Sequence, residues 1–379
     1  MRIDWVREAG ALEPIAAGWR ALEGAVRRRT HVSTFDFLAP WYRHYAGAYG
    51  GSPLIGLAWQ GTELAGVAPL TIRRGRLGRI PVTRVDFAPN DSIAGEFLAG
   101  DDQPEIVAAL LDSLVQQARF DVICLNGFDP ASAQLLEVQH AAGGHRLAVH
   151  TEEHAYAMVD LTGGYERYRA GLTRRCRGAL NQKARKVDAA VATVEGVQPG
   201  DDRDRIEASI NRMIAITEAS YKLQGQRLAD RHRAFLGEIA RRFGARHMLS
   251  LPILTIGGRD AAFILGVVER GCFYDVTLAY DDSFAKLSPG AYLMQATLQR
   301  LAATGISTVI SHGAHEYKRH WATAFVPQHR VFLFPRRPRA TAARVVRFGV
   351  QPLWGRLTAR AAAPANVTRR TGLFGTAGG

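Results

Sequence analysis

The most distinctive chemistry in this sequence lies in residues 279–322. Asp281 ends a predicted strand, and Ser288 and Pro289 open a predicted helix. Serine suits the N-cap of a helix, and proline suits the first helical position. Such a helix start presents free N–H groups and the positive end of the helix dipole, which both attract phosphate. Gly290 keeps the approach open, so this turn predicts an anion site, although simple helix capping has the same sequence pattern.

A second group of reactive side chains follows the next predicted strand. His312, Tyr317, Lys318 and Trp321 lie close together in the sequence, and Lys318 is one of only five lysines in the chain. A lysine in such surroundings can stabilise a developing oxyanion or hold a phosphate. The alternative is an ordinary surface lysine.

A basic helix is predicted at residues 169–186, which hold seven basic residues and no acid. Its apolar residues recur every three or four positions and define one face. The opposite face carries Arg174, Arg177 and Arg185. A solvated helix face would account for this pattern, but the shortage of nearby acids makes an anionic ligand a competing interpretation.

The C-terminal segment 336–379 contains nine arginines and no acid, and so holds nine of the 13 net positive charges. Gly349 and Pro352 interrupt it, so two short amphipathic helices are expected. A solvated tail is one interpretation. Another is attachment to an anionic membrane surface, with Phe348 and Trp354 at the interface. Binding of an anionic effector such as a cyclic dinucleotide is a third.

Composition excludes several classes of protein. With 379 residues, 47% hydrophobic and 22% charged, the chain is an ordinary globular protein of two domains. Its three cysteines show no metal-ligand spacing, and no metal is expected. The first residues do not resemble a secretion signal, so we expect a cytoplasmic location, with peripheral contact at the inner membrane as an extension. Neither a serine-hydrolase nor a P-loop motif is present.

The predicted elements repeat one order. Each half of the chain reads as helices, a three-strand meander, a helix, a strand and a final strand, which predicts an α/β (α+β) protein with two similar domains. The domains are expected at 1–160 and 161–335, followed by the basic tail at 336–379. One continuous helix is expected from Tyr165 to Val187.

Taken together, these segments resemble the CelD/BioF2-like acetyltransferase family of the GNAT superfamily, which is related to the FemABX aminoacyltransferases. The resemblance rests on segments in a characteristic order: LTRRCRGALNQKARKV, AYD, LSPGAYLMQATL and HGAHEYKRHWA, with Trp41-Tyr42, 67–70 and 86–91 in the first half. It implies tandem GNAT-like domains, each with a mixed, mainly antiparallel sheet flanked by helices.

The resemblance also implies an activity and a set of site residues. It implies an N-acyltransferase that uses acetyl-CoA or another acyl-CoA, with an amine on a sugar or exopolysaccharide precursor as acceptor. The donor would lie at the segment that replaces the usual glycine-rich loop, with Ser288, Pro289, Gly290 and Tyr292. Substrate phosphate would contact Arg174 or Arg177, with Asp91 also in the acceptor site. Tyr317 and Lys318 match the aromatic–lysine pair of the Fem relatives.

Amine acylation needs a base and a proton donor for the leaving thiolate. Asp281, His312 and Glu316 are all candidates for the base, and the sequence does not choose among them. Tyr292 or Tyr317 could protonate the thiolate. The alternatives are a Fem-like transferase that uses aminoacyl-tRNA, and a membrane-surface or cyclic-dinucleotide-responsive effector. Other nucleic acids are not expected, because no RNA-binding motif is present.

Overall fold

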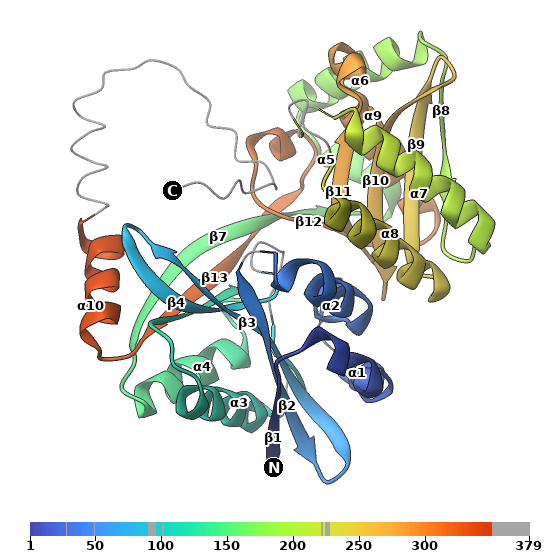
Figure 1. Ribbon diagram of the computed structural model, residues 1–379. Coiled ribbons are helices and arrows are strands. Elements are labelled where there is room, and N and C mark those ends of the chain that lie inside the picture. Colours follow the sequence, from blue (N-terminus) through green and yellow to red (C-terminus); the bar gives the residue numbers. More distant parts are fainter. Residues whose placement is uncertain are drawn as a thin grey trace. The chain divides into compact units, whose positions relative to one another are not determined.

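The computed structural model describes residues 1–27, 29–48, 50–89, 96–100, 102–220, 223 and 228–350. The chain divides into two compact units (Figure 1). Unit 1 comprises Met1–His154 and the chain from Gln328 onward, and unit 2 comprises Ala155–Pro327. The first division therefore lies six residues before the expected position at 160/161. Residues 328–335, expected in the second domain, group with unit 1.

Unit 1 is built on a sheet with the strand order β1-β2-β3-β4-β6-β13-β7 and a short β5 beside β3. The β4–β6 pair is parallel, and the other pairs described by register are antiparallel. The elements are β1 (Arg2–Val6), η1 (Ala9–Ile15), α1 (Ala16–Ala25), η2 (His31–Ser33), α2 (Phe35–Trp41), η3 (Tyr42–Ala46), β2 (Gly51–Gln60), β3 (Glu63–Leu77), β4 (Ile80–Phe87), β5 (Leu98–Ala99), α3 (Pro104–Gln117), β6 (Val122–Phe128), α4 (Ala133–Gly144), β7 (Ala148–Asp160), β13 (Ala324–Phe334), α10 (Pro338–Arg344) and η7 (Val345–Val350).

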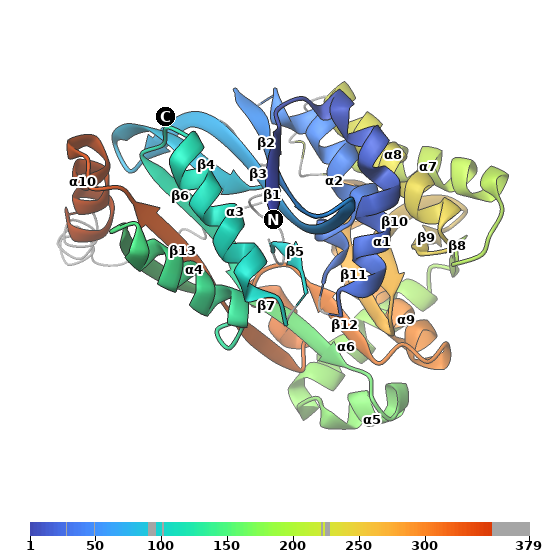
Figure 2. The ribbon, with the colours of Figure 1, turned by 90° about the horizontal axis from the view of Figure 1, so that it is seen from below.

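Helices cover both faces of this sheet (Figure 2). On one face, α3 and α4 form a core with β3, β4 and β6, because α3 places Ile106, Leu110 and Leu114 on one side of the helix. On the other face, α1 and α2 pack around Trp19 and Phe35. A methyl group on Gly66 would lie 2.3 Å from Ile106 Cγ2, so α3 can approach β3 this closely only at a glycine.

Unit 2 is built on a sheet with the order β7-β12-β11-β10-β9-β8. Only β11 and β12 run parallel, joined by the crossover helix α9; the other pairs are antiparallel. Its elements are α5 (Gly164–Gly171), α6 (Arg174–Asp188), β8 (Ala192–Val197), α7 (Arg203–Glu218), α8 (Asp230–Ala245), β9 (Leu249–Ile256), β10 (Arg259–Glu269), β11 (Cys272–Tyr280), η5 (Asp282–Leu287), α9 (Pro289–Ala303), β12 (Thr308–Ser311) and η6 (Glu316–His320). The predicted fold class, a mixed and mainly antiparallel sheet flanked by helices, is confirmed.

Local sequence signals explain the turns of unit 2. The hairpins predicted at Gly257-Gly258 and Arg270-Gly271 are confirmed, with positive φ at all four residues. The single helix predicted for 165–187 is wrong, because the chain breaks after Gly171 and α6 starts anew. The Thr173 hydroxyl accepts a hydrogen bond from the backbone N–H of Cys176 at 3.2 Å and caps this second helix.

The segment after β13 packs on unit 1 as α10 and η7. Of the two short helices expected in the tail, the described part therefore includes a helical stretch from Pro338 to Val350. Pro352, Trp354 and the last four arginines lie outside the described residues. Among the residues that the structure describes, no helix is both long and apolar enough to cross a membrane.

Candidate active site

The central strands of unit 2 separate where the predicted site begins. β12 pairs with β11 over four residues only, and the last pair is Asp275 with Ser311. β11 continues for five more residues, to Tyr280. Along this extension, the side chains of 276–278 are half-buried, whereas those of 273–275 are buried. The sheet thus opens at this point, between the end of one ladder and the start of α9.

The start of α9 combines an unusual backbone with close packing. Ser288 is in the left-handed region, with φ 55° and ψ 51°. Its carbonyl accepts the N–H groups of Ala291 and Tyr292 at 3.1 and 3.3 Å. The expected side-chain cap is not formed, because capping serines need an extended backbone. Among the described residues, the Gly290 N–H has no acceptor, and a methyl group on Gly290 would lie 3.0 Å from Leu278 Cδ2.

Tyr292 joins α9 to α6. Its hydroxyl donates a hydrogen bond to Asp188 Oδ1 at 2.8 Å. Burial, and then the neighbouring Asp188 carboxylate, raise the pKa of Tyr292 to about 12. The phenol therefore keeps its proton at neutral pH and is held by a carboxylate that the sequence did not single out.

Asp281 serves the turn that leads into α9. Its carboxylate accepts the backbone N–H of Ser283 at 2.8 Å and caps η5. Arg259 approaches the same carboxylate at 3.5 Å and lies over the ring of Phe284. Asp281, one of the predicted bases, therefore stabilises the turn before α9.

Lys318 lies in a buried polar chain that the sequence did not reveal. Only 2% of its surface is exposed. Its Nζ donates to the Ser311 hydroxyl at 2.8 Å and to the carbonyl of His312. The Ser311 hydroxyl donates in turn to Asp275 Oδ2 at 2.6 Å. Because a buried ammonium needs acceptors and a counter-charge, these contacts stabilise the charged form in place.

Tyr317, next to Lys318 in the sequence, is exposed, with 59% of its surface accessible. Its ring stacks on that of His315 with centroids 6.0 Å apart, and Lys318 Nζ lies 5.9 Å from its centroid. His312 is half-buried and uses its carbonyl to accept from Lys318.

The predicted catalytic residues therefore form two groups. Lys318, Tyr317 and His312 lie near the last β11–β12 pair, whereas Asp281 and Ser288 lie at the far end of β11. Asp281 lies six positions after Asp275, just beyond the end of the strand. At about 3.3 Å per residue this corresponds to roughly 20 Å of backbone. A single small substrate does not span that length, but an extended one does.

The two arginines predicted to hold phosphate differ. Arg177 is half-buried, and its Nη1 donates to the carbonyls of Leu172 and of Ala170, the latter at 3.0 Å. These are the carbonyls that the end of α5 leaves without helical partners, so Arg177 caps that helix. Arg174 is exposed and has no ion pair among the described residues. Asp91 lies outside the described residues.

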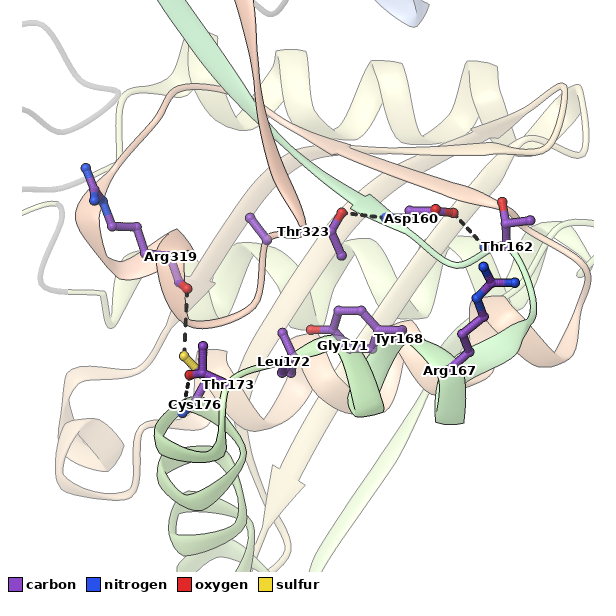
Figure 3. Close-up of a pocket in the computed structure, with 11 residues that line it drawn as sticks. Asp160, Thr162, Arg167, Tyr168, Gly171, Leu172, Thr173, Cys176, Arg319 and Thr323 are labelled. Atoms are coloured by element: carbon purple, nitrogen blue, oxygen red, sulfur yellow. Dashed lines mark hydrogen bonds between the residues drawn. The ribbon is translucent and has the colours of Figure 1, made fainter.

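Two cavities flank these helices. One, of about 300 Å³, lies between α5, α6 and the chain around η6 (Figure 3). Figure 3 shows the Cys176 thiol directed toward the Arg319 carbonyl, with 4.0 Å between sulfur and oxygen. It also shows Asp160, whose carboxylate accepts a hydrogen bond from the backbone N–H of Thr162. A second cavity, of about 210 Å³, lies between α5, α6 and α9 and is lined by Tyr292 and Asp188. Neither cavity is lined by Lys318 or Ser288. No cluster of metal-ligating side chains occurs in the described part of the chain.

Comparison with known proteins agrees with this geometry. Residues 174–319, from the start of α6 to η6, match the model of the acetyltransferase (GNAT) domain. The chain is accordingly an enzyme of the transferase class. The narrower CelD/BioF2-like assignment stays a prediction. No curated protein matches the chain.

Solved structures extend the similarity to most of the chain. FemX aligns over 87% of this chain and 97% of its own, with 11% identity and a TM-score of 0.56. L-PGS from Bacillus licheniformis aligns over 87% and 95%, with 10% identity and a TM-score of 0.55. A conserved protein of unknown function from Bacteroides thetaiotaomicron aligns over 88% and 100%, with 12% identity and a TM-score of 0.54. At this level of identity the likeness concerns the fold.

Proposed function

We propose that the protein is an acyl-CoA-dependent N-acyltransferase that transfers an acetyl or similar acyl group to an amine, on a sugar or exopolysaccharide precursor. The observation that carries this proposal is the separation of β11 from β12 directly in front of α9, within the segment that matches the acetyltransferase domain. An acyl-CoA is long, with a diphosphate near one end and the thioester at the other. The two groups of predicted residues suit the two ends of such a donor.

The diphosphate end is assigned to the opening of α9. A helix of 15 residues directs its positive end there, and the Gly290 N–H is available to an acceptor. Pro289 supplies no N–H, so this cradle has fewer donors than a glycine-rich loop. Lys286, exposed on η5 just before the helix, can supply the missing charge. This lysine was not among the predicted site residues, although its place two residues before Ser288 was visible in the sequence.

The acyl end is assigned to the region of Tyr317 and His312. The amine nitrogen forms its bond to the acyl carbon, the carbon–sulfur bond breaks, and a base takes the amine proton. His312 and Glu316 lie on this side, whereas Asp281 lies at the diphosphate end, so the proposal favours the former two. Lys318 acts in it as a positioning residue, because its ammonium holds the turn through Ser311 and the His312 carbonyl.

Calorimetric titration with acetyl-CoA tests the donor. We expect binding by the wild-type chain and binding about fivefold weaker for Lys286→Gln, since one exposed charge contact contributes about 1 kcal/mol. Arg203→Gln, which removes an exposed charge at the start of α7, is the matched control and should bind normally. Absence of binding by acetyl-CoA and by longer acyl-CoAs would refute the proposal.

Aminoacyl-tRNA as the donor is the second candidate, and α6 favours it. Arg174, Arg175, Arg185 and Lys186 are exposed and have no ion pairs among the described residues. A polyanion suits this surface. Filter binding of aminoacyl-tRNA that is tight and steeply dependent on salt, together with no binding of acyl-CoA, would favour this candidate over the first.

A further inference from the structure

Unit 1 carries a basic surface that takes no part in the proposed transfer chemistry. We define this basic face by two sets of arginines, on the β3–β4 hairpin and on the C-terminal arm, residues 336–350. The hairpin contributes Arg74, Arg76 and Arg79, and the arm contributes Arg336, Arg337 and Arg344. All are exposed except Arg344, which is half-buried, and none forms an ion pair with another described residue.

Direct contacts hold the arm against the hairpin. Ala340 and Ala343 of α10 are fully buried and pack in one cluster with Leu77 and Val82. Arg339 Nε donates to the carbonyl of Pro81 on β4 at 2.7 Å. Figures 1 and 2 both show α10 beside the tip of this hairpin. The two sets of arginines therefore share one face of unit 1, although more than 250 residues separate them in the sequence.

The acids near this face already have partners. Asp86 is buried and lies between Arg73 and Arg84. Asp121 pairs with Arg339, at 3.5 Å. These acids thus neutralise Arg73, Arg84 and Arg339, and they leave the six arginines of the basic face without ion pairs.

A third acid has the same effect in the arm. Glu152 accepts from Arg347 at 2.5 Å, in the segment that precedes Val350. The basic face consequently keeps six arginines without ion pairs among the described residues, which gives it a positive potential.

Exposed apolar side chains accompany the charge. Val345 and Val350 of η7 are 48% and 40% exposed, among the few large apolar side chains that the described surface exposes. The chain then continues for 29 residues with Trp354 near its start, four arginines and no acid. Arginines together with aliphatic and tryptophan side chains are typical of surfaces that bind at the headgroup level of a bilayer.

The aromatic side chain of the arm is not available to a nucleic acid. The ring of Phe348 packs against that of His150, with centroids 3.7 Å apart and planes tilted by 32°, and also contacts Phe332 and Phe334. Proteins that bind single strands need exposed rings on which bases can stack. The described basic face offers aliphatic groups instead, which favours lipid over nucleic acid.

We propose that the basic face binds the surface of a membrane rich in anionic lipid. The arginines of hairpin and arm contact the headgroups, and the valines of η7 enter the interface. This proposal is independent of the transfer chemistry, because it concerns only unit 1. It would place the enzyme beside lipid-linked acceptors.

Vesicle flotation with the full chain tests the proposal. We expect binding to vesicles of phosphatidylcholine mixed with phosphatidylglycerol, weak binding to pure phosphatidylcholine, and release by salt. Replacing Arg74, Arg76 and Arg79 with glutamine, or Arg336, Arg337 and Arg344, should each reduce binding about tenfold or more, since each arginine near an anionic surface adds roughly 1 kcal/mol. Thermal unfolding of each variant shows that it is folded.

The control removes the same charge elsewhere. Arg2, Arg7 and Arg203 are exposed, and their replacement with glutamine should leave vesicle binding unchanged. Equal binding to both kinds of vesicle, or equal loss in the control, would overturn the proposal. So would tRNA or a cyclic dinucleotide that binds the basic face and displaces the protein from vesicles, because the natural partner would then be a nucleotide.

Discussion

Ser311 and Asp275 face each other at the last pair of the β11–β12 ladder, and the Ser311 hydroxyl donates to the Asp275 carboxylate at 2.6 Å. Both residues are buried, and Ser311 also accepts from the Lys318 ammonium at 2.8 Å. One hydroxyl therefore connects a buried anion to a buried cation at the place where the sheet opens.

Removing this hydroxyl should destabilise the protein. Ser311→Ala removes the hydrogen bond to the buried Asp275 carboxylate and one of the hydrogen bonds of the buried Lys318 ammonium, which costs about 1–3 kcal/mol or more. Urea unfolding measures the change. Ser307→Ala is the matched control, because Ser307 is exposed and its hydroxyl makes only long contacts, 3.4 Å to the Gly271 carbonyl and 3.5 Å to the Thr308 hydroxyl. Its unfolding midpoint should hardly move. A Ser311→Ala protein as stable as wild type would contradict the connection.

Tyr292 should make the free energy of unfolding depend on pH in the alkaline range. Its pKa is raised in the folded state from 10.0 to about 12. Folding therefore favours the protonated phenol, and this contribution is complete below pH 10 and is lost as pH rises toward 12. Tyr292→Phe should reduce the loss of stability over that window. Asp188→Asn should lower the phenol pKa, because it removes a carboxylate that raises it; a pKa that stays at about 12 would contradict this cause.

Arg174 and Arg177 should give opposite results on substitution. Arg177→Gln loses the cap on α5 and should destabilise the protein by about 1–2 kcal/mol, measured by chemical unfolding. Arg174→Gln should leave stability unchanged and, if it contacts the acceptor, raise the acceptor KM. The reverse pattern would show that the contacts of Arg177 do not stabilise α5.

Gly266 should tolerate no side chain. A methyl group there would lie 2.1 Å from the ring of Phe273, which is fully buried on the neighbouring strand. Gly266→Ala should therefore destabilise unit 2 by about 1–3 kcal/mol through overpacking. Gly143→Ala on α4, with nothing within 4 Å of the added methyl, should be neutral or slightly stabilising. Thermal unfolding of the two variants compares them directly.

Local signals made much of the fold predictable. Gly257-Gly258 and Arg270-Gly271 located the hairpins of unit 2, and Ser288-Pro289 located the start of α9. The break between α5 and α6 was missed, because the apolar spacing continues across Leu172 and Thr173 and a lone threonine is a weak cap signal.

The site was less predictable than the fold, because it depends on long-range register. Lys318 was visible as a rare residue. Its partner Ser311 and the buried Asp275 were not, since parallel pairing joins residues 36 positions apart and leaves no local pattern. Only one part of the basic face could be predicted from the sequence. The arm stood out by its composition, but the packing of α10 on the β3–β4 hairpin, which places the hairpin arginines beside the arm, left no sequence signal.

The two boundaries between the units lie within β7 and β13, and this affects folding of the chain during its synthesis. β13 pairs with β6 at residues 329–333, yet all of unit 2 is synthesised between these strands. A nascent chain cannot complete the first sheet until the second unit has left the ribosome, so the β6 edge stays open to wrong partners for most of translation. Chains cut short before β13 should accordingly aggregate rather than yield a folded first unit.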